Sequence, residues 1–288
     1  MKITALLENN KLNENFCEKH GLSLYVETNN HKILFDAGDD LLFENAKKHN
    51  IDLSFVDIIV ISHGHYDHTN GLNKLLTINK IAKVYILKSA LNEFYKINKN
   101  SNQNKYIGIN KDLLYKLNNN IDNYADRFVF TFDGYEIDKG LTLYSNFKQI
   151  YLNSISNNNL YVLNDSQYYY DTFDHEQVLI ISEENNTNTN NVLFGGCCHN
   201  GILNILNKLK HLNINYCISG FHFKDLDITD CNDVIFIYNI FKELLKENIK
   251  FYTLHCTGLD IYNFINNGID TLKNKSINYL YSGSNIII

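Results

Sequence analysis

A continuous run of β-branched residues, followed at once by a histidine cluster, constrains this chain more than any other feature. Residues 57–62 read Asp-Ile-Ile-Val-Ile-Ser, a pattern typical of a strand that is buried on both faces of a sheet. The next six residues read His63-Gly64-His65-Tyr66-Asp67-His68. Four side chains that can bind a metal therefore lie on the loop that leaves a buried strand.

Short strands and helices alternate along the rest of the chain. Strands are predicted at residues 3–7, 23–27, 32–35, 83–87, 128–132, 141–144, 178–182, 191–194, 216–219, 250–254, 277–281 and 286–288. Helices are predicted at residues 41–49, from 72 onward, and at 202–212, 233–247 and 260–267. A polar turn is predicted at residues 185–190. Because strands alternate with helices, the sequence predicts an α/β fold in one domain that spans residues 1–288.

The region from about residue 90 to 175 has a different character. It is rich in Asn, Lys and Tyr and shows little periodicity. Two interpretations remain open, a polar insertion with small strands of its own and a lid-like insertion that covers a pocket.

Composition excludes several classes of function. The net charge of -6 gives no electrostatic footprint for nucleic acid, and no stretch approaches the length of a membrane span. The six cysteines form no CxxC pair and no regular spacing, so neither a disulfide framework nor a cysteine-based zinc site is indicated. We expect a cytoplasmic protein that acts on a small-molecule substrate. The sequence does not indicate an oligomeric state.

The histidine cluster has the spacing of a metal site. His63 and His65 lie two apart on an extended segment, so both rings can point to one side. Two imidazoles and a third ligand suit zinc or iron(II). Asp67 and His68 follow at once and can bind a second ion beside the first. Two ions ~3.5–4 Å apart can activate water and stabilise both the attacking and the leaving oxygen of an ester.

Three further histidines follow predicted strands, at the edge where α/β sheets present their sites. They are His199, His222 and His255. His175 precedes a strand, and its role is ambiguous. The remaining histidines, in loops or helices without such a context, are interpreted as surface residues; they are His20, His31, His49 and His211.

Three cysteines lie next to the proposed ligands: Cys197, Cys198 and Cys256. Each thiol could bind metal, act as a nucleophile, or simply fill a tight loop.

Seven short segments of the sequence resemble the metallo-β-lactamase superfamily. The resemblance is closer still to its dihydropterin-ribofuranosyl-aminobenzene-phosphate synthase-like branch. The segments that carry the resemblance are residues 7–10 (LENN), 20–23 (HGLS), 34–38 (LFDAG), 62–68 (SHGHYDH), 196–201 (GCCHNG), 220–223 (GFHF) and 255–258 (HCTG). They run in order through nearly the whole chain. The resemblance implies a four-layer αββα sandwich with the metal site along one edge.

The resemblance also implies a set of ligands. It assigns His63 and His65 to the first ion, and Asp67, His68 and His255 to the second. The superfamily pattern also expects a bridging Asp after the second strand of a hairpin, whereas this chain has Gly-Gly-Cys-Cys-His after Phe194. His199 is the candidate for the missing ligand, with His175 as the alternative. Asp36 is expected to brace the ligand loop through hydrogen bonds.

Three functions follow as hypotheses. The first is a metal-dependent hydrolase that uses a metal-activated water on a small phosphorylated or ester-type substrate. It would hold two divalent ions, with zinc expected and manganese or iron as alternatives. Asp67 or His222 would handle protons, or His222 and Thr257 would contact the substrate.

The second hypothesis is a synthase-type transferase that joins an aminobenzene ribose phosphate to a dihydropterin, with aromatic residues of the 90–175 region stacking on the substrate. The third is a non-hydrolytic di-iron or metal-binding module.

Overall fold

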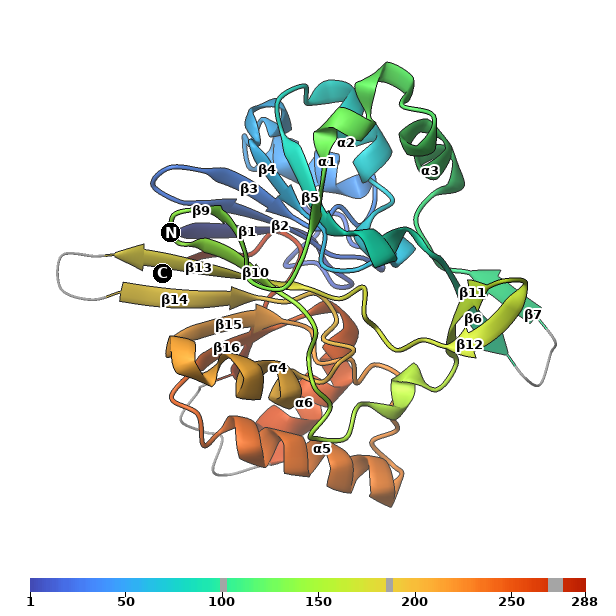
Figure 1. The fold of residues 1–288 in the computed structure, drawn as a ribbon. Coiled ribbons are helices and arrows are strands. Elements are labelled where there is room, and N and C mark those ends of the chain that lie inside the picture. Colours follow the sequence, from blue (N-terminus) through green and yellow to red (C-terminus); the bar gives the residue numbers. More distant parts are fainter. Residues whose placement is uncertain (99–102, 185–188, 269–276) are drawn as a thin grey trace.

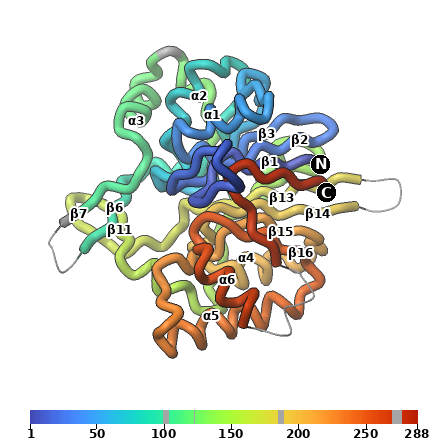
Figure 2. The backbone as a smooth tube through the Cα atoms, turned by 180° about the vertical axis from the view of Figure 1, so that it is seen from behind, coloured from blue at the N-terminus to red at the C-terminus, as the bar shows by residue number. Residues whose placement is uncertain are grey.

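Two seven-stranded sheets form the centre of the molecule in the computed structural model, which describes residues 1–98, 103–184, 189–268 and 277–288 (Figure 1). The first sheet has the order β18 (Asn285–Ile287), β1 (Lys2–Leu7), β2 (Ser23–Glu27), β3 (Lys32–Phe35), β4 (Ile58–Val60), β5 (Lys83–Leu87) and β8 (Phe128–Thr131). The second has the order β17 (Ile277–Tyr279), β16 (Lys250–Thr253), β15 (Tyr216–Ser219), β14 (Thr189–Phe194), β13 (Val178–Glu184), β10 (Leu141–Tyr144) and β9 (Tyr135–Asp138). Seen from behind, the C-terminal strand β18 lies beside β1 (Figure 2), with which it pairs antiparallel.

Helices cover the outer face of each sheet. Those on the first sheet are α1 (Leu41–Lys48), α2 (Leu72–Ile78) and α3 (Lys111–Asn118). Those on the second are α4 (Ile202–Leu209), α5 (Cys231–Leu244) and α6 (Leu259–Gly268). Side chains alternate between the layers: Ile33 and Phe35 of β3 enter the core between the sheets, while Leu34 packs toward the helices. The predicted α/β fold and the four-layer αββα sandwich are confirmed.

The predicted elements agree with the structure except near their ends. Strand β4 is shorter than predicted, because Ser62 turns to hydrogen-bond Asp36. Helix α5 begins early, at Cys231, because the Asp230 side chain accepts hydrogen bonds from two backbone amides of its first turn. Part of the turn predicted at 185–190 lies outside the described residues. No described helix is long and apolar enough to cross a membrane.

The region from residue 90 to 175 contains two kinds of element. Strands β8, β9 and β10 belong to the large sheets, and α3 contributes to the first helical layer. The other strands form a separate four-stranded sheet, which projects from the sandwich (Figure 1): β12 (Gln167–Tyr170), β11 (Leu160–Asn164), β6 (Glu93–Asn98) and β7 (Gln103–Tyr106). A small core of Phe94, Ile107, Leu160 and Phe173 lies beneath it, with Tyr66 packed against it.

The direction of the central strands positions the site. Strands β3, β4, β5 and β8 are parallel to one another, and so are β14, β15, β16 and β17. The carboxyl ends of each parallel set therefore lie at one edge of its sheet. The loops after β3, β4, β14, β15 and β16 carry the candidate ligands.

Candidate metal centre

The first group of donors consists of His63, His65 and His199. One ligand atom from each lies within 4.8 Å of the other two. The Nε2 atom of His63 is 3.1 Å from the Nδ1 atom of His65, and all three rings are buried. The Nε2 atom of His199 has no hydrogen-bond partner, although it is buried. Such atoms are costly unless something binds them, which points to a ligand at their centre.

The second group is built around Asp67. Its Oδ2 atom is 3.3 Å from Nε2 of His255 and 3.9 Å from Nε2 of His68. All three side chains are buried. His68 is the last residue of the short helical turn Tyr66–His68. His255 is the first residue of the turn His255–Thr257, which follows β16. The structure therefore brings together all six predicted metal residues, three in each group.

His20 joins the second group, and its interpretation as a surface residue was wrong. Its side chain is 36% exposed, but its Nε2 atom is 3.0 Å from Oδ2 of Asp67. Its ring stacks on that of His255, with centroids 4.9 Å apart. His20 lies in the loop that precedes β2, and this loop brings its ring to the sheet edge where Asp67 lies. The residues next to His20 in the sequence gave no indication of this position. The segment 20–23 was nevertheless among the stretches that carry the family resemblance.

His175, the alternative to His199, is already engaged through both ring nitrogens. Its Nδ1 atom accepts a hydrogen bond from the amide of Gly64, and its Nε2 atom lies 3.0 Å from Oδ2 of Asp171. Asp171 is also 3.8 Å from Nε2 of His65, so the three side chains form a further cluster. The geometry brings His199, rather than His175, to His63 and His65 together. Asp171 had no signal in the sequence, because it lies in a polar stretch.

Asp36 braces both groups, as predicted. Its Oδ1 atom accepts a hydrogen bond from the amide of Ser62 at 2.7 Å. Its Oδ2 atom accepts from the Ser62 hydroxyl at 2.7 Å and from Nδ1 of His68 at 2.6 Å. Because Ser62 Oγ is also 2.9 Å from Nδ1 of His63, one carboxylate orients a histidine of each group.

Two buried glutamates hold the loops that carry the remaining histidines. Glu8 accepts a hydrogen bond from the amide of His255 at 2.7 Å, and Glu176 accepts one from the amide of His199 at 2.7 Å. Asparagines orient the two rings: Asn9 Oδ1 is 2.9 Å from Nδ1 of His255, and Asn157 Oδ1 is 2.9 Å from Nδ1 of His199. Local sequence patterns pointed to none of these four residues, although Glu8 and Asn9 fall in residues 7–10, which carry the family resemblance.

Electrostatics leaves the histidines able to bind a metal and favours a cation at the second group. Burial lowers the pKa of His63, His65, His199 and His255, so these imidazoles are neutral and able to bind a metal. Burial also opposes the charged form of His68, but Asp36 and Asp67 outweigh it and raise the pKa of His68 to about 9. Burial would raise the pKa of Asp67, yet the neighbouring histidines hold it well below its usual range. The carboxylates at the second group therefore already attract positive charge.

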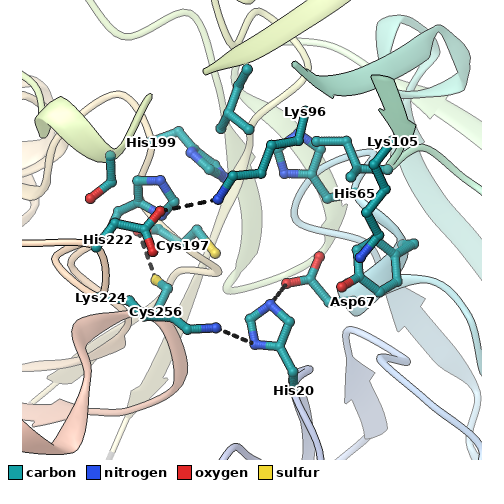
Figure 3. Close-up of a pocket in the computed structure, with 15 residues that line it drawn as sticks. His20, His65, Asp67, Lys96, Lys105, Cys197, His199, His222, Lys224 and Cys256 are labelled. Atoms are coloured by element: carbon teal, nitrogen blue, oxygen red, sulfur yellow. Dashed lines mark hydrogen bonds and ion pairs between the residues drawn. The ribbon is translucent and has the colours of Figure 1, made fainter. Parts of the chain in front are cut away.

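A cavity of about 250 Å³ opens onto both groups. Figure 3 shows His65, Asp67, Cys197 and His199 along it, with His222 beside His199. The two ring nitrogens of His222 are buried and have no hydrogen-bond partner. Thr257, by contrast, accepts a hydrogen bond from the amide of Phe221 and is fully buried, which leaves it a structural role.

Three lysines line the same cavity (Figure 3): Lys96 of β6, Lys105 of β7 and Lys224 after β15. Lys96 Nζ is 3.3 Å from Oδ2 of Asp225, and Lys224 Nζ is 3.3 Å from Nδ1 of His20. Lys105 Nζ lies 5.1 Å from the centroid of the Tyr66 ring. In a chain with a net charge of -6, this gathering of cations is a local feature of the cavity.

Donor types and spacing fit divalent metal ions. A tetrahedral ion with bonds of about 2.0–2.3 Å to N and S holds its ligands ~3.3–3.7 Å apart. The His63–His65 separation of 3.1 Å and the Asp67–His255 separation of 3.3 Å are close to this spacing. The buried, unpartnered Nε2 atom of His199 agrees with it.

Comparisons with known proteins agree with this fold. Residues 18–143 match the model of the metallo-beta-lactamase superfamily. The chain is 29% identical over 257 residues to an uncharacterized protein of Methanocaldococcus jannaschii, covering 88% of this chain and 90% of the relative. It is 28% identical over 269 residues to the 7,8-dihydropterin-6-methyl-4-(beta-D-ribofuranosyl)-aminobenzene-5'-phosphate synthase of the same organism, covering 87% and 85%.

A solved structure extends the likeness of fold to the whole chain. Tm1679, described as a metal-dependent hydrolase of the beta-lactamase superfamily, superposes with a TM-score of 0.75 at 23% identity. The match covers 100% of this chain and 99% of that protein. Residues 18–143 are therefore similar in sequence to the metallo-β-lactamase superfamily, and the whole chain shares the fold of Tm1679.

Proposed function

We propose that the protein is a metal-dependent hydrolase that acts on a small phosphorylated substrate. The observation that carries the proposal is the convergence of two donor groups on a cavity lined by three lysines. His63, His65 and His199 would hold one divalent ion. Asp67, His68 and His255 would hold the other, with His20 beside Asp67.

Zinc suits these nitrogen and oxygen donors, and manganese or iron are the alternatives. When bound, the ions would lower the pKa of water and stabilise the charge that develops on the substrate oxygens.

The protein's own groups would orient the substrate and move protons. Lys96, Lys105 and Lys224 would contact the anionic oxygens, because cationic side chains form charge-assisted hydrogen bonds to phosphate. Asp67 is held as a carboxylate, so it would hold the second ion and orient the attacking water through a hydrogen bond. His222 lines the cavity with both ring nitrogens unpartnered, so it can donate a proton to a leaving oxygen.

We also propose that the small sheet acts as a lid, since it supplies part of the cavity wall. Lys96 and Lys105 come from β6 and β7, and Ile107 and Leu160 complete that side. Closure of such a wall would exclude water from the substrate. The lid and the sandwich together would form one functional domain over residues 1–288.

Hydrolysis of a phosphodiester, with a neutral ester for comparison, tests the proposal. Protein loaded with zinc, manganese or iron should cleave bis(p-nitrophenyl) phosphate, and His65→Ala should abolish the activity. His211→Ala is the matched control, because His211 is exposed and distant in sequence from both groups. Activity that survives in His65→Ala would refute the assignment.

The lysines are tested by the difference between charged and neutral substrates. Lys105→Gln and Lys224→Gln should each raise KM for the phosphodiester ~5-fold, the effect of about 1 kcal/mol for a partly exposed charge contact. They should leave hydrolysis of p-nitrophenyl acetate unchanged, and Lys47→Gln on α1 should affect neither substrate. Equal effects on both substrates would remove the role in phosphate binding.

A synthase-type transferase is the second candidate, favoured by the similarity to the dihydropterin synthase of M. jannaschii. Within the described residues, the part of the cavity wall that comes from 90–175 carries no aromatic side chain. Phe94 and Phe173 instead pack against His65, His175 and His199. Consumption of a dihydropterin by metal-loaded protein would support this candidate, and no consumption would exclude it.

The setting of the protein is part of the proposal. All six cysteines are free, which suits a reducing cytoplasm. The acidic net charge and the small cavity favour a small-molecule substrate over a nucleic acid.

A further inference from the structure

The thiol of Cys197 lies between the two donor groups. Its Sγ atom is 3.3 Å from Nε2 of His68, which belongs to the second group. It also lies within 4.8 Å of a ligand nitrogen of His63, which belongs to the first. The side chain is 3% exposed, and Figure 3 shows it on the cavity wall below His199 and His222.

Cys197 belongs to two donor clusters, one of which connects the two groups. One cluster joins it to His63 and His68, and another joins it to His199 and His222. Among the described residues, no Asp or Glu belongs to a cluster that contains members of both groups. Asp67 clusters with His20 and His255 and lies near His68 of the same group, and Asp171 clusters with His65 and His175.

The other two thiols near the site have other hydrogen-bond partners, although Cys256 also lines the cavity. Cys198 Sγ is 2.7 Å from the Ser219 hydroxyl, and the residue belongs to the core beneath α4 and α5. Cys256 Sγ donates a hydrogen bond to the carbonyl oxygen of Cys197 at 3.4 Å. Neither thiol belongs to a donor cluster. Of these three cysteines, Cys197 is the one whose sulfur lies among the candidate ligands.

Local backbone structure fixes Cys197 at this point. Gly196, just before it, is packed so closely that a Cβ atom there would lie 2.2 Å from Ser62 Oγ and 3.2 Å from His63 Nδ1. The loop after β14 is therefore pressed against the bracing network of Asp36, Ser62 and His63. Cys198, just after it, has a φ of 55°, in the left-handed region, so the backbone changes direction between Cys197 and His199.

From this geometry we propose that Cys197 is a metal ligand, whose sulfur would help to hold the second ion beside His68. The inference rests on the proposed metal centre. The 3.3 Å spacing between Sγ and His68 Nε2 matches that of two ligands on one ion. Cys197 would bind as the thiolate: its S–H bond would break, its proton would pass to solvent, and no oxidation state would change.

Cobalt(II) substitution tests the inference without an activity assay. Sulfur bound to cobalt(II) gives a charge-transfer absorption in the near ultraviolet that nitrogen and oxygen ligands do not give. The full-length protein, loaded with cobalt, should bind two ions per chain and show this band. Cys197→Ser should lose the band and bind the second ion at least ~100-fold more weakly, since even the loss of an outer hydrogen-bond partner costs ~10–100-fold.

Matched variants make the result specific. Cys198→Ser and Cys256→Ser should retain the band, whereas Cys197→Asp should lose it and keep two ions, because a carboxylate can take the same place. If Cys197→Ser does not fold, the inference is tested by whether the wild type and Cys256→Ser both show the band. A band lost in Cys256→Ser or kept in a folded Cys197 variant would overturn the inference. So would two bound cobalt ions without a band in the wild type, which would leave the proposed metal centre intact. Failure to bind cobalt at all would refute the metal centre itself.

Discussion

Replacing Asp36 with Asn should weaken both the fold and the second metal position. Asp36 Oδ1 can be replaced by the amide oxygen, which still accepts from the amide of Ser62. The amide nitrogen, in contrast, stands where Oδ2 accepts from the Ser62 hydroxyl and from Nδ1 of His68. Two buried, charge-assisted hydrogen bonds are lost, and His68 loses its nearest anion.

The magnitude follows from these contacts. Hydrogen bonds to a charged group contribute about 1.5–3 kcal/mol each, so two of them contribute about 4 kcal/mol. The new amide can recover about 1 kcal/mol through a neutral hydrogen bond to Ser62. We therefore expect the free energy of unfolding to fall by about 3 kcal/mol, in the range for breaking a buried ion pair. Metal affinity at the second position should fall ~10–100-fold.

Two measurements test this prediction. Urea unfolding of the metal-free protein gives the change in stability, and zinc titration against a chromophoric chelator gives the change in affinity. Asp39→Asn is the matched control: Asp39 contacts the exposed Lys19, so its replacement should cost less than about 1 kcal/mol. If Asp36→Asn matches the wild type in both measurements, the carboxylate does not brace the site.

Three further outcomes are expected. Burial raises the pKa of Glu8 from 4.5 to about 7. The folded state therefore binds the Glu8 proton more tightly than the unfolded state does. As a result, the contribution of Glu8 to stability falls as pH rises between these two values. The difference in unfolding free energy between wild type and Glu8→Gln should thus decline by about 3 kcal/mol from pH 4.5 to 8 in urea titrations, whereas parallel pH curves would contradict the burial argument. Gly196→Ala should lower the free energy of unfolding by about 1–3 kcal/mol in the same assay, because the added Cβ would meet Ser62. Gly268→Ala is the control and should change it little, because a Cβ there has open space. Equal effects of the two variants would count against close packing at Gly196. A chelator should lower the Tm of the metal-loaded protein by roughly 5–10 °C, from about 2.7 kcal/mol per ion at a hundredfold excess over Kd. Calorimetry checks this, and an equal shift in His65→Ala would show that the ion binds elsewhere.

Strong local patterns made the sandwich predictable from sequence. The β-branched run of β4 is buried on both faces, so the sequence carries no polar alternation to obscure it. Helix α4 buries Ile202, Ile205 and Leu209 at helical spacing. The small sheet lacked such a signal, because β12 exposes all four of its residues and β6 alternates irregularly. Its strands are held by pairing with one another, which no single segment encodes.

The candidate site was predictable where ligands follow strands. His63, His65, Asp67, His68, His199 and His255 were identified in this way, and the structure brings them into two groups. His20, Glu8, Glu176 and Asp171 lie in loops whose paths depend on tertiary packing, so their positions required the structure. The role of Cys197 also required it, because only the geometry separates this thiol from Cys198 and Cys256.

Anomalous diffraction from crystals of the zinc-loaded protein, recorded at the zinc absorption edge, tests the central claim most directly. Two peaks are expected, one among His63, His65 and His199 and the other among Asp67, His68 and His255. A peak among His65, Asp171 and His175 in place of the first, or no peak at either group, would contradict it.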